Sequence, residues 1–458
     1  MRISTSQIYD AGALGIQRNQ AAVFKTSNQI SSGRRILTPA DDPVAAAQAL
    51  VVTQSQSVTK QHLANQAIAS DQLALVDTQL GSLTDLLQSV RDRVVQAGNT
   101  TLANSDRQAI ATEIDSRLGE MMGIANIDNG SGDYMFSGYK GGTLPFAVSG
   151  GDPISPAKVS PIGYFGDDGQ RLLQVSTSQQ MAINVAGSDL FMTATSGNGS
   201  FIASSASGNG GTGTVDAGSV LDREKWQAAV NLLPGNNPAL QIKFTVVHDP
   251  IDPTDPDLDK RYYQLFDATP STPVAVSDPV LFSPGSPISL VTTAVASPIP
   301  TIPPTPSTTL PAGTDFGARV VISGVPSDGD TFTITPDSSQ SIFQTMQSLI
   351  GILRTPIGTS TYSTTQLAQD LRAQLTNVDQ ALDNVSQIRA TMGTRMNELD
   401  SLASASTAEG IQYTSTLSDL QDLDYVKAIT DFSKQQVNLE AAQKSFVQIS
   451  GLSLFKYI

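Results

Sequence analysis

Residues 73–97 read LALVDTQLGSLTDLLQSVRDRVVQA. Apolar side chains recur in this stretch at alternating intervals of three and four residues, at Leu73, Val76, Leu80, Leu83, Leu87, Val90, Val94 and Ala97. That alternation is the heptad repeat of a coiled-coil helix. Gly98 and Asn99 end the repeat. The stretch therefore predicts a long helix whose apolar stripe packs against another helix.

The last third of the chain carries a matching stripe. Its apolar positions are Leu367, Leu371, Leu375, Val378, Leu382, Val385, Ile388, Met392, Met396 and Leu399. A final helix is expected from Val426 to Ile449. We expect one intrachain seam, formed by Leu73, Leu80 and Leu87 with Leu371, Val378 and Leu382. Helices of this length favour an antiparallel rod that carries the middle of the chain at its far end. A compact helix bundle is the alternative, since an apolar stripe is often plain core.

Proline separates the ends from the middle. Residues 1–140 hold two of the 25 prolines, residues 341–458 hold one, and all others lie between. Proline breaks helices and central strands, so the middle is expected to be short strands and loops. Strands are predicted at 241–247, 261–266, 319–322 and 331–334, and a helix at 222–233. The stretches 195–218 and 270–311 are rich in Gly, Ser or Pro and are expected to lack structure.

These patterns predict an α+β fold with long antiparallel terminal helices and an inserted β-rich region. We divide the chain into five segments: 1–45 and 411–458 for assembly, 46–140 and 341–410 for the helical rod, and 141–340 for the inserted surface region. Asp41, Asp42 and Pro43 are expected to form a turn that starts a helix, with both carboxylates near its N-terminus. An intersubunit contact of these carboxylates with a basic residue is the alternative. Ser105 and Gln108 are expected to cap the helix that follows residue 104.

Composition excludes several function classes. The net charge of −15 argues against a general binder of nucleic acid, because phosphate backbones need a surplus of Lys and Arg. There is no cysteine, so disulfides, Cys-ligated metals and thiol nucleophiles are absent. His62 and His248 are the two histidines, which excludes multi-His metal sites. No apolar run is long enough to span a membrane or to act as a cleaved signal, so we expect no membrane insertion.

Two motifs could carry chemistry, and both have a simpler interpretation. Residues 208–213 match G-x-G-x-x-G but lack the strand before and the helix after that a dinucleotide site needs, so we interpret them as a loop. Five aspartates between 249 and 259 could hold a hard cation, but no EF-hand glycine or closing glutamate accompanies them. A solvated acidic loop is the favoured interpretation. We therefore expect no catalytic, cofactor or metal site, and no enzyme.

Four segments resemble the bacterial flagellin family. The first is Gln29-Ile30-Ser31-Ser32-Gly33-Arg34-Arg35-Ile36-Leu37-Thr38-Pro39-Ala40-Asp41-Asp42-Pro43. The others are Gly132–Tyr139 with Pro145-Phe146, Asp422–Thr430, and Leu439–Phe446 with Leu452–Ile458. Within the family, Thr38-Pro39 and the C-terminal Phe455-Lys456-Tyr457-Ile458 are more similar to the hook-associated junction proteins than to filament subunits. The resemblance covers roughly residues 1–148 and 341–458.

The resemblance implies a structural role at the junction between hook and filament. It implies export through the flagellar type III apparatus without cleavage, and an extracellular location on the flagellum. The implied partners are copies of the chain itself, the first hook-associated junction protein, flagellin, and an export chaperone that covers the C-terminal helix. Ser32, Gly33, Asp41, Asp42 and Pro43 fall in the resembling segments and are assembly candidates. The side chains expected to face neighbouring copies are Phe446, Leu452, Leu454 and Phe455.

Three alternatives stay open on the sequence. The chain could be a filament subunit, or the middle region could carry an enzymatic activity, or it could mediate adhesion. About 190 residues in the middle exceed what a minimal junction protein needs, so this region is interpreted as an extra surface domain.

Overall fold

The computed structural model describes residues 5–99, 101–148, 161–233, 238–248, 259–270, 272–293, 310–337, 339–358 and 362–454. The chain forms two compact units. The terminal unit comprises Met1–Ile68, Gln174–Gln180 and Asn397–Ile458. The insert unit comprises Ala69–Leu173 and Met181–Met396.

Helices form most of both ends of the chain, as the heptad stripes predict. Their bounds are α1 Thr5–Ser32, α2 Pro43–Ala97, α3 Asn104–Ala125, α4 Arg223–Val230, α5 Ile342–Arg354, α6 Thr364–Gln421 and α7 Tyr425–Leu454, with one π-helical turn, η1, at Ser188–Met192.

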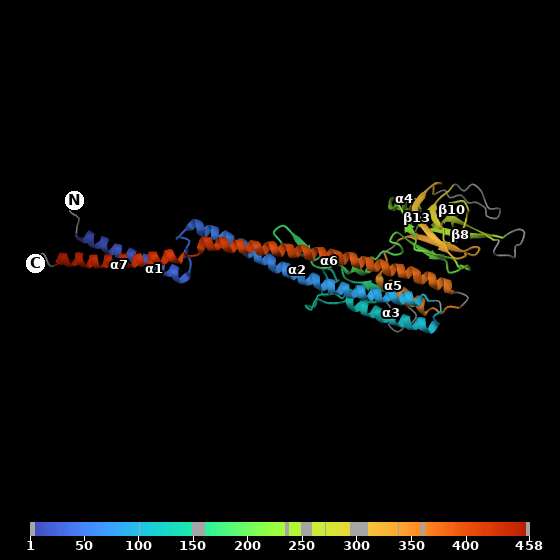
Figure 1. The fold of residues 1–458 in the computed structure, drawn as a ribbon, viewed down its shortest axis with the longest axis horizontal. Coiled ribbons are helices and arrows are strands. Elements are labelled where there is room, and N and C mark those ends of the chain that lie inside the picture. Colours follow the sequence, from blue (N-terminus) through green and yellow to red (C-terminus); the bar gives the residue numbers. More distant parts are fainter. Residues whose placement is uncertain are drawn as a thin grey trace. The chain divides into compact units, whose positions relative to one another are not determined.

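In the terminal unit, α1 lies along α7 in the antiparallel direction (Figure 1). The Thr26 hydroxyl donates to Gln435 Oε1 over 2.9 Å. The initial part of α2 and the final part of α6 also run antiparallel. Gln56 donates to Thr414 over 3.0 Å, and Gln66 further along α2 donates to Ser406. Residue numbers rise on one helix as they fall on the other, which confirms the predicted antiparallel pairing.

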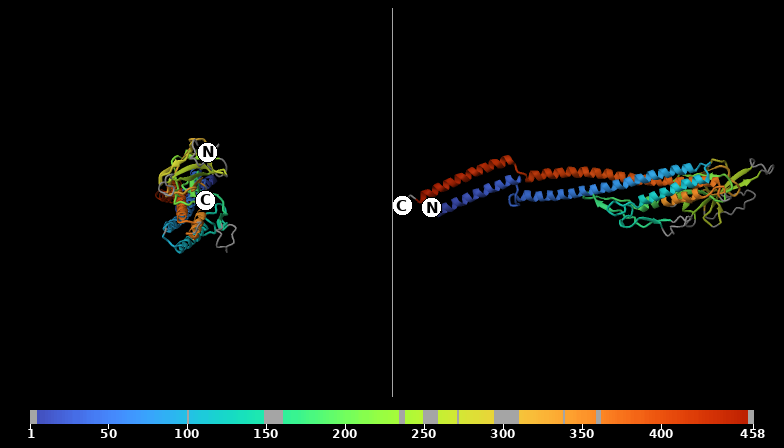
Figure 2. Two further views of the ribbon diagram at one scale, coloured as in Figure 1. Left: turned by 90° about the vertical axis from the view of Figure 1, so that its right-hand side faces the viewer. Right: turned by 90° about the horizontal axis from the view of Figure 1, so that it is seen from below.

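In the insert unit, the rest of α2 pairs with the first part of α6 in the same way. Two ion pairs cross between them, Arg91–Asp379 at 2.7 Å and Arg389–Asp77 at 3.0 Å. Helices α3 and α5 lie beside them and against each other (Figure 2). On α5, Ile342, Phe343, Met346, Leu349, Ile350 and Leu353 are buried, which is one face at helical spacing.

The start of α3 differs from the prediction. The helix begins at Asn104, after Ala103, so Ser105 and Gln108 are not its capping pair. Asp106 in the first turn accepts a hydrogen bond from the Ala103 N–H over 3.2 Å instead. A carboxylate satisfies this terminal donor and also lies at the positive end of the helix dipole.

The middle of the chain folds into antiparallel sheets. A six-stranded sheet has the order β10-β9-β8-β14-β5 with β11 also on β9, and a four-stranded sheet has the order β12-β13-β6 with β7 on β13. Strands β1 and β2 form one two-stranded sheet, and strands β3 and β4 form another. The bounds are β1 Phe146–Val148, β2 Ile162–Tyr164, β3 Leu172–Gln174, β4 Gln180–Ala182, β5 Phe201–Ser205, β6 Thr214–Val215, β7 Ser219–Val220, β8 Leu240–Val247, β9 Lys260–Asp267, β10 Val274–Ala275, β11 Val280–Leu281, β12 Pro287–Val291, β13 Asp315–Ser323 and β14 Thr331–Pro336.

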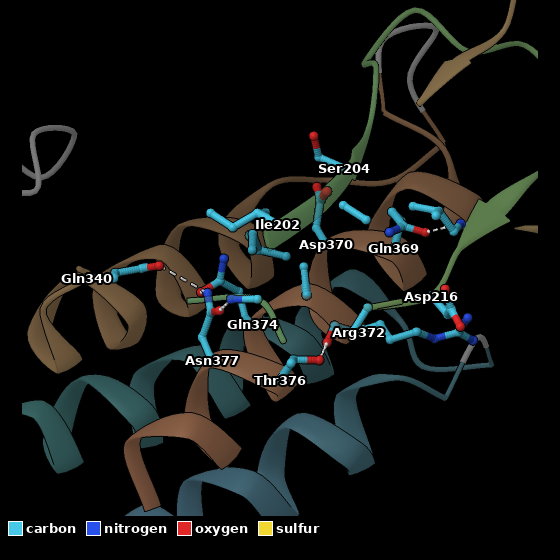
Figure 3. A pocket seen from close by; sticks show the side chains of 16 residues that line it. Ile202, Ser204, Asp216, Gln340, Gln369, Asp370, Arg372, Gln374, Thr376 and Asn377 are labelled. Atoms are coloured by element: carbon cyan, nitrogen blue, oxygen red, sulfur yellow. Dashed lines mark hydrogen bonds between the residues drawn. The ribbon is translucent and has the colours of Figure 1, made fainter. Parts of the chain in front are cut away.

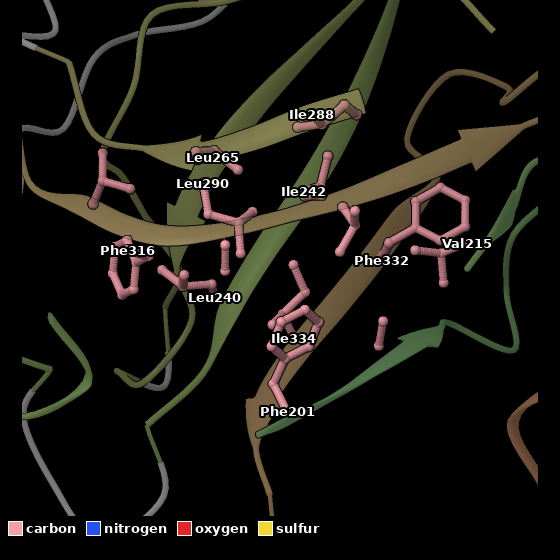
Figure 4. Packing of buried hydrophobic residues seen from close by; sticks show 14 of the residues in the cluster. Phe201, Val215, Leu240, Ile242, Leu265, Ile288, Leu290, Phe316, Phe332 and Ile334 are labelled. Atoms are coloured by element: carbon pink, nitrogen blue, oxygen red, sulfur yellow. The ribbon is translucent and has the colours of Figure 1, made fainter. Parts of the chain in front are cut away.

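The two larger sheets share one apolar core (Figure 4). Alternate residues of each strand enter it, as period-2 geometry requires. Those from the long strands are Leu240, Ile242 and Phe244 on β8, Leu265 on β9, Phe316, Ala318, Val320 and Ile322 on β13, and Phe332 and Ile334 on β14. Trp226 on α4 joins this core, so the predicted strands and the predicted helix around Trp226 are confirmed.

The expectation of unstructured chain at 195–218 is wrong. Strand β5 and strand β6 lie there, and Phe201 is fully buried. Of 270–311, residues 272–293 contain β10, β11 and β12, with Ile288 and Leu290 buried, and 294–309 lie outside the described residues. Gly, Ser and Pro dilute the apolar pattern, but two or three buried side chains per strand suffice when the partner strands supply the rest of the core.

Candidate assembly site

Helices α1 and α6 end next to each other. Helix α1 ends at Ser32 and α6 ends at Gln421, and the residues after the two ends are hydrogen-bonded to each other. The Leu423 N–H donates to the Gly33 carbonyl over 3.0 Å, and the Arg35 N–H donates to the Gln421 carbonyl over 2.7 Å. We call residues 33–35 and 421–423 the joint of the terminal unit. It brings two of the quoted sequence segments together although they lie almost 400 positions apart.

Gly33 has a conformational reason to be glycine. Its φ is +69°, in the left-handed region, and a Cβ atom there would lie 2.9 Å from the Tyr425 phenolic oxygen. Ser32 stabilises the same turn: its hydroxyl donates to the Gln29 carbonyl and accepts from the Arg34 N–H. Both predicted assembly residues therefore shape the joint.

Asp41 closes the loop between α1 and α2. Its Oδ1 lies 2.7 Å from Lys25 Nζ, and its Oδ2 accepts from the N–H groups of Leu37 and Thr38. The hydrogen bond from Lys25, followed by that from Thr38, holds the pKa of the Asp41 carboxyl well below its ordinary value.

Asp42 and Pro43 start α2, as predicted. Asp42 Oδ1 accepts from the Ala45 N–H over 3.1 Å, which is an N-cap, and Pro43 occupies the first helical position, where no N–H is needed. The bond from Ala45 and then that from Arg35, 3.1 Å from Asp42 Oδ2, lower the pKa of Asp42. Within one chain, Lys25 and Arg35 supply the basic partners of the two carboxylates. An intersubunit contact stays a prediction.

Phe446 packs on α1 of its own chain. Its ring lies edge-to-face on Tyr9 with centroids 5.8 Å apart. A Cβ atom built on Gly12 would lie 2.7 Å from the Phe446 ring, so the absence of a side chain at Gly12 makes room for it. The half-buried ring therefore has an intrachain contact, and its predicted contact with a neighbouring copy stays a prediction. Leu452 and Leu454 fall in the last turn of α7, and their side chains, like Phe455, lie outside the described residues.

Five of the six side chains predicted to form the seam are buried. Leu73, Leu80 and Leu87 are fully buried on α2, and Leu371 and Val378 are buried on α6. Leu382 is only partly buried, whereas Ala381 and Val385 beside it are buried. The stripe on α6 thus moves to position 381, because a straight helix of 3.6 residues per turn drifts relative to a strict heptad.

Sequence reasoning missed the role of the Arg35 side chain beside the joint. The Arg35 guanidinium donates to the Leu420 carbonyl over 2.8 Å and also pairs with Asp42. Arg35 lies in the segment 29–43 that resembles the flagellin family, and this position could have pointed to a structural role. However, nothing in the sequence indicates that its partner is the end of a helix near residue 420.

The glycine-rich motif noted for chemistry does not form a dinucleotide site, and most of the acidic stretch cannot be compared with the structure. In the loop 208–213, the Asp330 carboxylate already accepts the Gly210 and Gly211 N–H groups, and β6 follows instead of a helix. Residues 249–258 of the acidic stretch lie outside the described residues, and Asp259 pairs with His248 at 2.9 Å. In the described part of the chain, no group of three His, Asp or Glu could hold a metal ion, and no helix is long and apolar enough to cross a membrane.

The helical ends match two family models. The bacterial flagellin N-terminal helical region matches residues 3–141, and the bacterial flagellin C-terminal helical region matches residues 375–458. Flagellar hook-associated protein 3 of Escherichia coli K12 is 25% identical over 456 residues, covering 100% of this chain and 99% of the relative. Escherichia coli K12 flagellin is 33% identical, but over 144 residues that cover 30% of this chain and 27% of flagellin. The crystal structure of the Legionella pneumophila flagellar junction protein FlgL is 26% identical with a TM-score of 0.62, covering 82% of this chain and all of that one.

Paired terminal helices that enclose an inserted β-rich region define a flagellin-type structural protein. The alignment with Escherichia coli K12 flagellin covers under a third of the chain, whereas the alignment with hook-associated protein 3 extends over its whole length. The chain belongs to the family of flagellar hook-associated protein 3, the flagellar junction protein FlgL. It is a structural component of the flagellum and not an enzyme.

Proposed function

We propose that this junction protein polymerises with copies of itself through the terminal unit and links the hook to the filament. The observation that carries the proposal is the exposure of large apolar side chains there. On α1, α7 and the adjoining parts of α2 and α6 they are Leu14, Phe24, Val44, Leu50, Val51, Val58, Ile68, Ile411, Tyr425, Val426, Ile429, Val437 and Val447. An apolar surface of this extent marks an interaction site.

The long helices of the insert unit, unlike those of the terminal unit, bury most of their large apolar side chains. They bury their stripe within the chain, from Leu73 to Ala97 on α2 and from Leu367 to Met392 on α6. The terminal unit buries few side chains larger than alanine. One exposed Leu-sized side chain gains about 1.5–3 kcal/mol on burial, and ordering a residue costs roughly 1–2 kcal/mol. The terminal helices therefore gain stability when other helices cover them.

The spacing of the exposed positions favours helices as the covering elements. Val44, Val51 and Val58 repeat every seven residues along α2, which is a second heptad stripe beside the one that α6 meets. Between these parts of α2 and α6 runs a groove of about 610 Å³, lined by Leu63, Ile411 and small residues such as Gly410. A helix of another copy fits such a groove.

The remaining partners follow from the family. We propose the first hook-associated junction protein as the neighbour on the hook side and flagellin on the filament side. A flagellar export chaperone would cover the apolar face of α7 before export through the flagellar type III apparatus. Phe446, Leu452, Leu454 and Phe455 are proposed contact residues at this end, and the five predicted segments stay our proposal for its domain organisation.

Immunogold electron microscopy of intact flagella tests the location. Antibody against residues 150–340 is expected to label one band where hook meets filament. Label along the whole filament would make the chain a filament subunit, and no label on flagella would overturn the proposal.

A pair of matched variants tests the surface. Val51 in the terminal unit is 66% exposed and Leu281 on β11 is 57% exposed, so neither substitution by Asp disturbs a core. Val51→Asp is expected to abolish the junction band and to release filaments into the medium, whereas Leu281→Asp assembles normally. A normal band from the Val51→Asp protein, secreted at the normal level, would contradict assembly through this surface.

A further inference from the structure

Helix α6 carries a second stripe, made of side-chain amides. Gln366, Gln369, Asn377, Gln380 and Asn384 follow one another at helical spacing and therefore lie on one face. This face differs from the apolar stripe that meets α2. Residue 373, between Gln369 and Asn377, occupies the same face and is alanine.

Each of these amides binds the inserted region. Gln366 accepts from Ser205, Gln369 from the Val215 N–H, Asn377 from the Gly197 N–H and Gln380 from Thr195, while Asn384 donates to the carbonyls of Asp189 and Leu190. The inserted sheets therefore rest on α6 through polar contacts.

The stripe has a gap at Ala373, and a cavity of about 250 Å³ lies there (Figure 3). One wall is α6, and the facing wall is formed by β5 with Ile202 and by the residues around β6. This volume is just below that of most sites for drug-sized ligands, which are roughly 300–1,000 Å³. The cavity therefore has room for one small ring.

Several polar groups in the wall have unused capacity. Gln369 is almost completely buried, and its Oε1 is engaged by Val215, but within the described residues its Nε2 donates to nothing. The same holds for Nε2 of Gln340 and of Gln374, whose oxygens each accept from Asn377. The carboxylates of Asp370 and Asp216 add acceptors. Donors and acceptors thus surround a wall that also contains Ile202, Val215 and Ala373.

The charge balance decides which chemistry fits. The cavity lining contains the carboxylates of Asp370 and Asp216 and one guanidinium, that of the exposed Arg372, so an anionic ligand would meet net repulsion. Hydroxyl groups can use donors and acceptors at once, since each hydroxyl donates one hydrogen bond and accepts others. A sugar ring offers several hydroxyls together with C–H groups that pack on aliphatic side chains.

We propose that this cavity binds one neutral hexose unit, either as a free monosaccharide or as the terminal residue of a glycan. The ligand would bridge α6 and the inserted sheets at the one position where the amide stripe is interrupted.

Saturation-transfer NMR and calorimetry on the full-length chain test the site, with glucose, galactose, mannose, N-acetylglucosamine and glucuronate as probes. We expect at least one neutral hexose to bind and glucuronate not to bind. A glycan array then separates the two sources: binding to arrayed chains that end in that hexose indicates a glycan, and binding to the free sugar alone indicates a monosaccharide. No binding by any neutral probe at millimolar concentration overturns the proposal, as does preferential binding of glucuronate.

Matched variants locate the site. Ala373→Leu fills the cavity without removing a hydrogen bond and should weaken hexose binding at least tenfold. Ala390→Leu makes the same change at an exposed position of α6 and should leave binding unchanged. Gln374→Leu removes a donor that has no protein partner, together with the oxygen that accepts over 3.4 Å from Asn377, whose amide also donates to Gln340. It should weaken hexose binding with only a small loss of thermal stability. Hexose binding that survives both Ala373→Leu and Gln374→Leu places it elsewhere and refutes this site.

Discussion

The Tyr425 hydroxyl closely approaches the backbone of Gly33: a Cβ atom built on Gly33 would lie 2.9 Å from the Tyr425 phenolic oxygen. Gly33 is the first residue of the break between α1 and α2, and Tyr425 is the first residue of α7 after the break from α6. The two breaks are therefore fitted to each other, and the joint depends on a residue that has no side chain.

Gly33→Ala should destabilise the joint. The left-handed φ of +69° costs alanine about 1 kcal/mol or more, and the Tyr425 ring must also move. Hydrogen exchange is expected to accelerate at the N–H groups of Arg35 and Leu423, which bridge the joint. Gly410→Ala, at an open helical position of α6 in the same unit, should instead stabilise by about 0.5–1 kcal/mol. Equal exchange rates at the joint in the Gly33→Ala protein and the wild type would contradict this role.

Gly12→Ala should weaken the pairing of α1 with α7. The new Cβ would lie 2.7 Å from the Phe446 ring, which must leave its place beside Tyr9. Gly15→Ala is the control, because nothing lies within 4 Å of a Cβ there. In an assay of polymerisation by purified protein, Gly12→Ala is expected to slow assembly and Gly15→Ala to preserve it. The prediction fails if the two variants assemble alike.

Burial, not heptad position, should decide the cost of truncating the seam. Leu80 is fully buried, so Leu80→Ala should lower the free energy of unfolding by about 2–5 kcal/mol in urea. Leu382→Ala should cost clearly less, because the side chain lies at the edge of the stripe. Comparable losses from the two substitutions would show that Leu382 belongs to the core after all.

The loop that Asp41 closes should open in acid. Its pKa is lowered in the folded chain, so the stabilisation is fully present above the unfolded carboxyl pKa of about 3.9 and is lost as the pH falls below it. The protection factors of the Leu37 and Thr38 N–H groups against hydrogen exchange, which correct for the intrinsic pH dependence of exchange, should therefore fall as the pH drops below about 4. In the Asp41→Asn protein these protection factors should already be low at neutral pH and change little in acid. Protection factors in the wild-type loop that do not change with pH would contradict the assignment.

The inserted sheets have a built-in reporter, because Trp226 is the one tryptophan in the sequence. The Phe201 ring lies 5.0 Å from it within the core. Phe201→Ala should destabilise this region by about 3–5 kcal/mol and shift the Trp226 emission to the red. Phe165→Ala, at an exposed position, should change stability by less than about 0.5 kcal/mol. Unchanged emission from the Phe201→Ala protein would show that the two rings do not share a core.

The heptad positions predicted the long helices well because the 3.6-residue period is a local property that each helix shows by itself. The same reasoning missed β5 and β12, whose few core side chains are scattered among Gly, Ser and Pro. Those strands are stable only when β14 and β13 pair with them, which no local pattern reveals.

The sequence by itself determined the apolar stripes, the start of α2 at Asp42-Pro43 and the flagellin-type ends, because each depends on neighbouring residues or on a continuous motif. Only the tertiary structure decided that Arg35 binds the end of α6, that Phe446 rests on Gly12, and that Ala373 leaves a cavity under the inserted sheets. Each of these joins residues hundreds of positions apart or lies between separate elements, so it exists only once the packed helices and sheets bring those residues together.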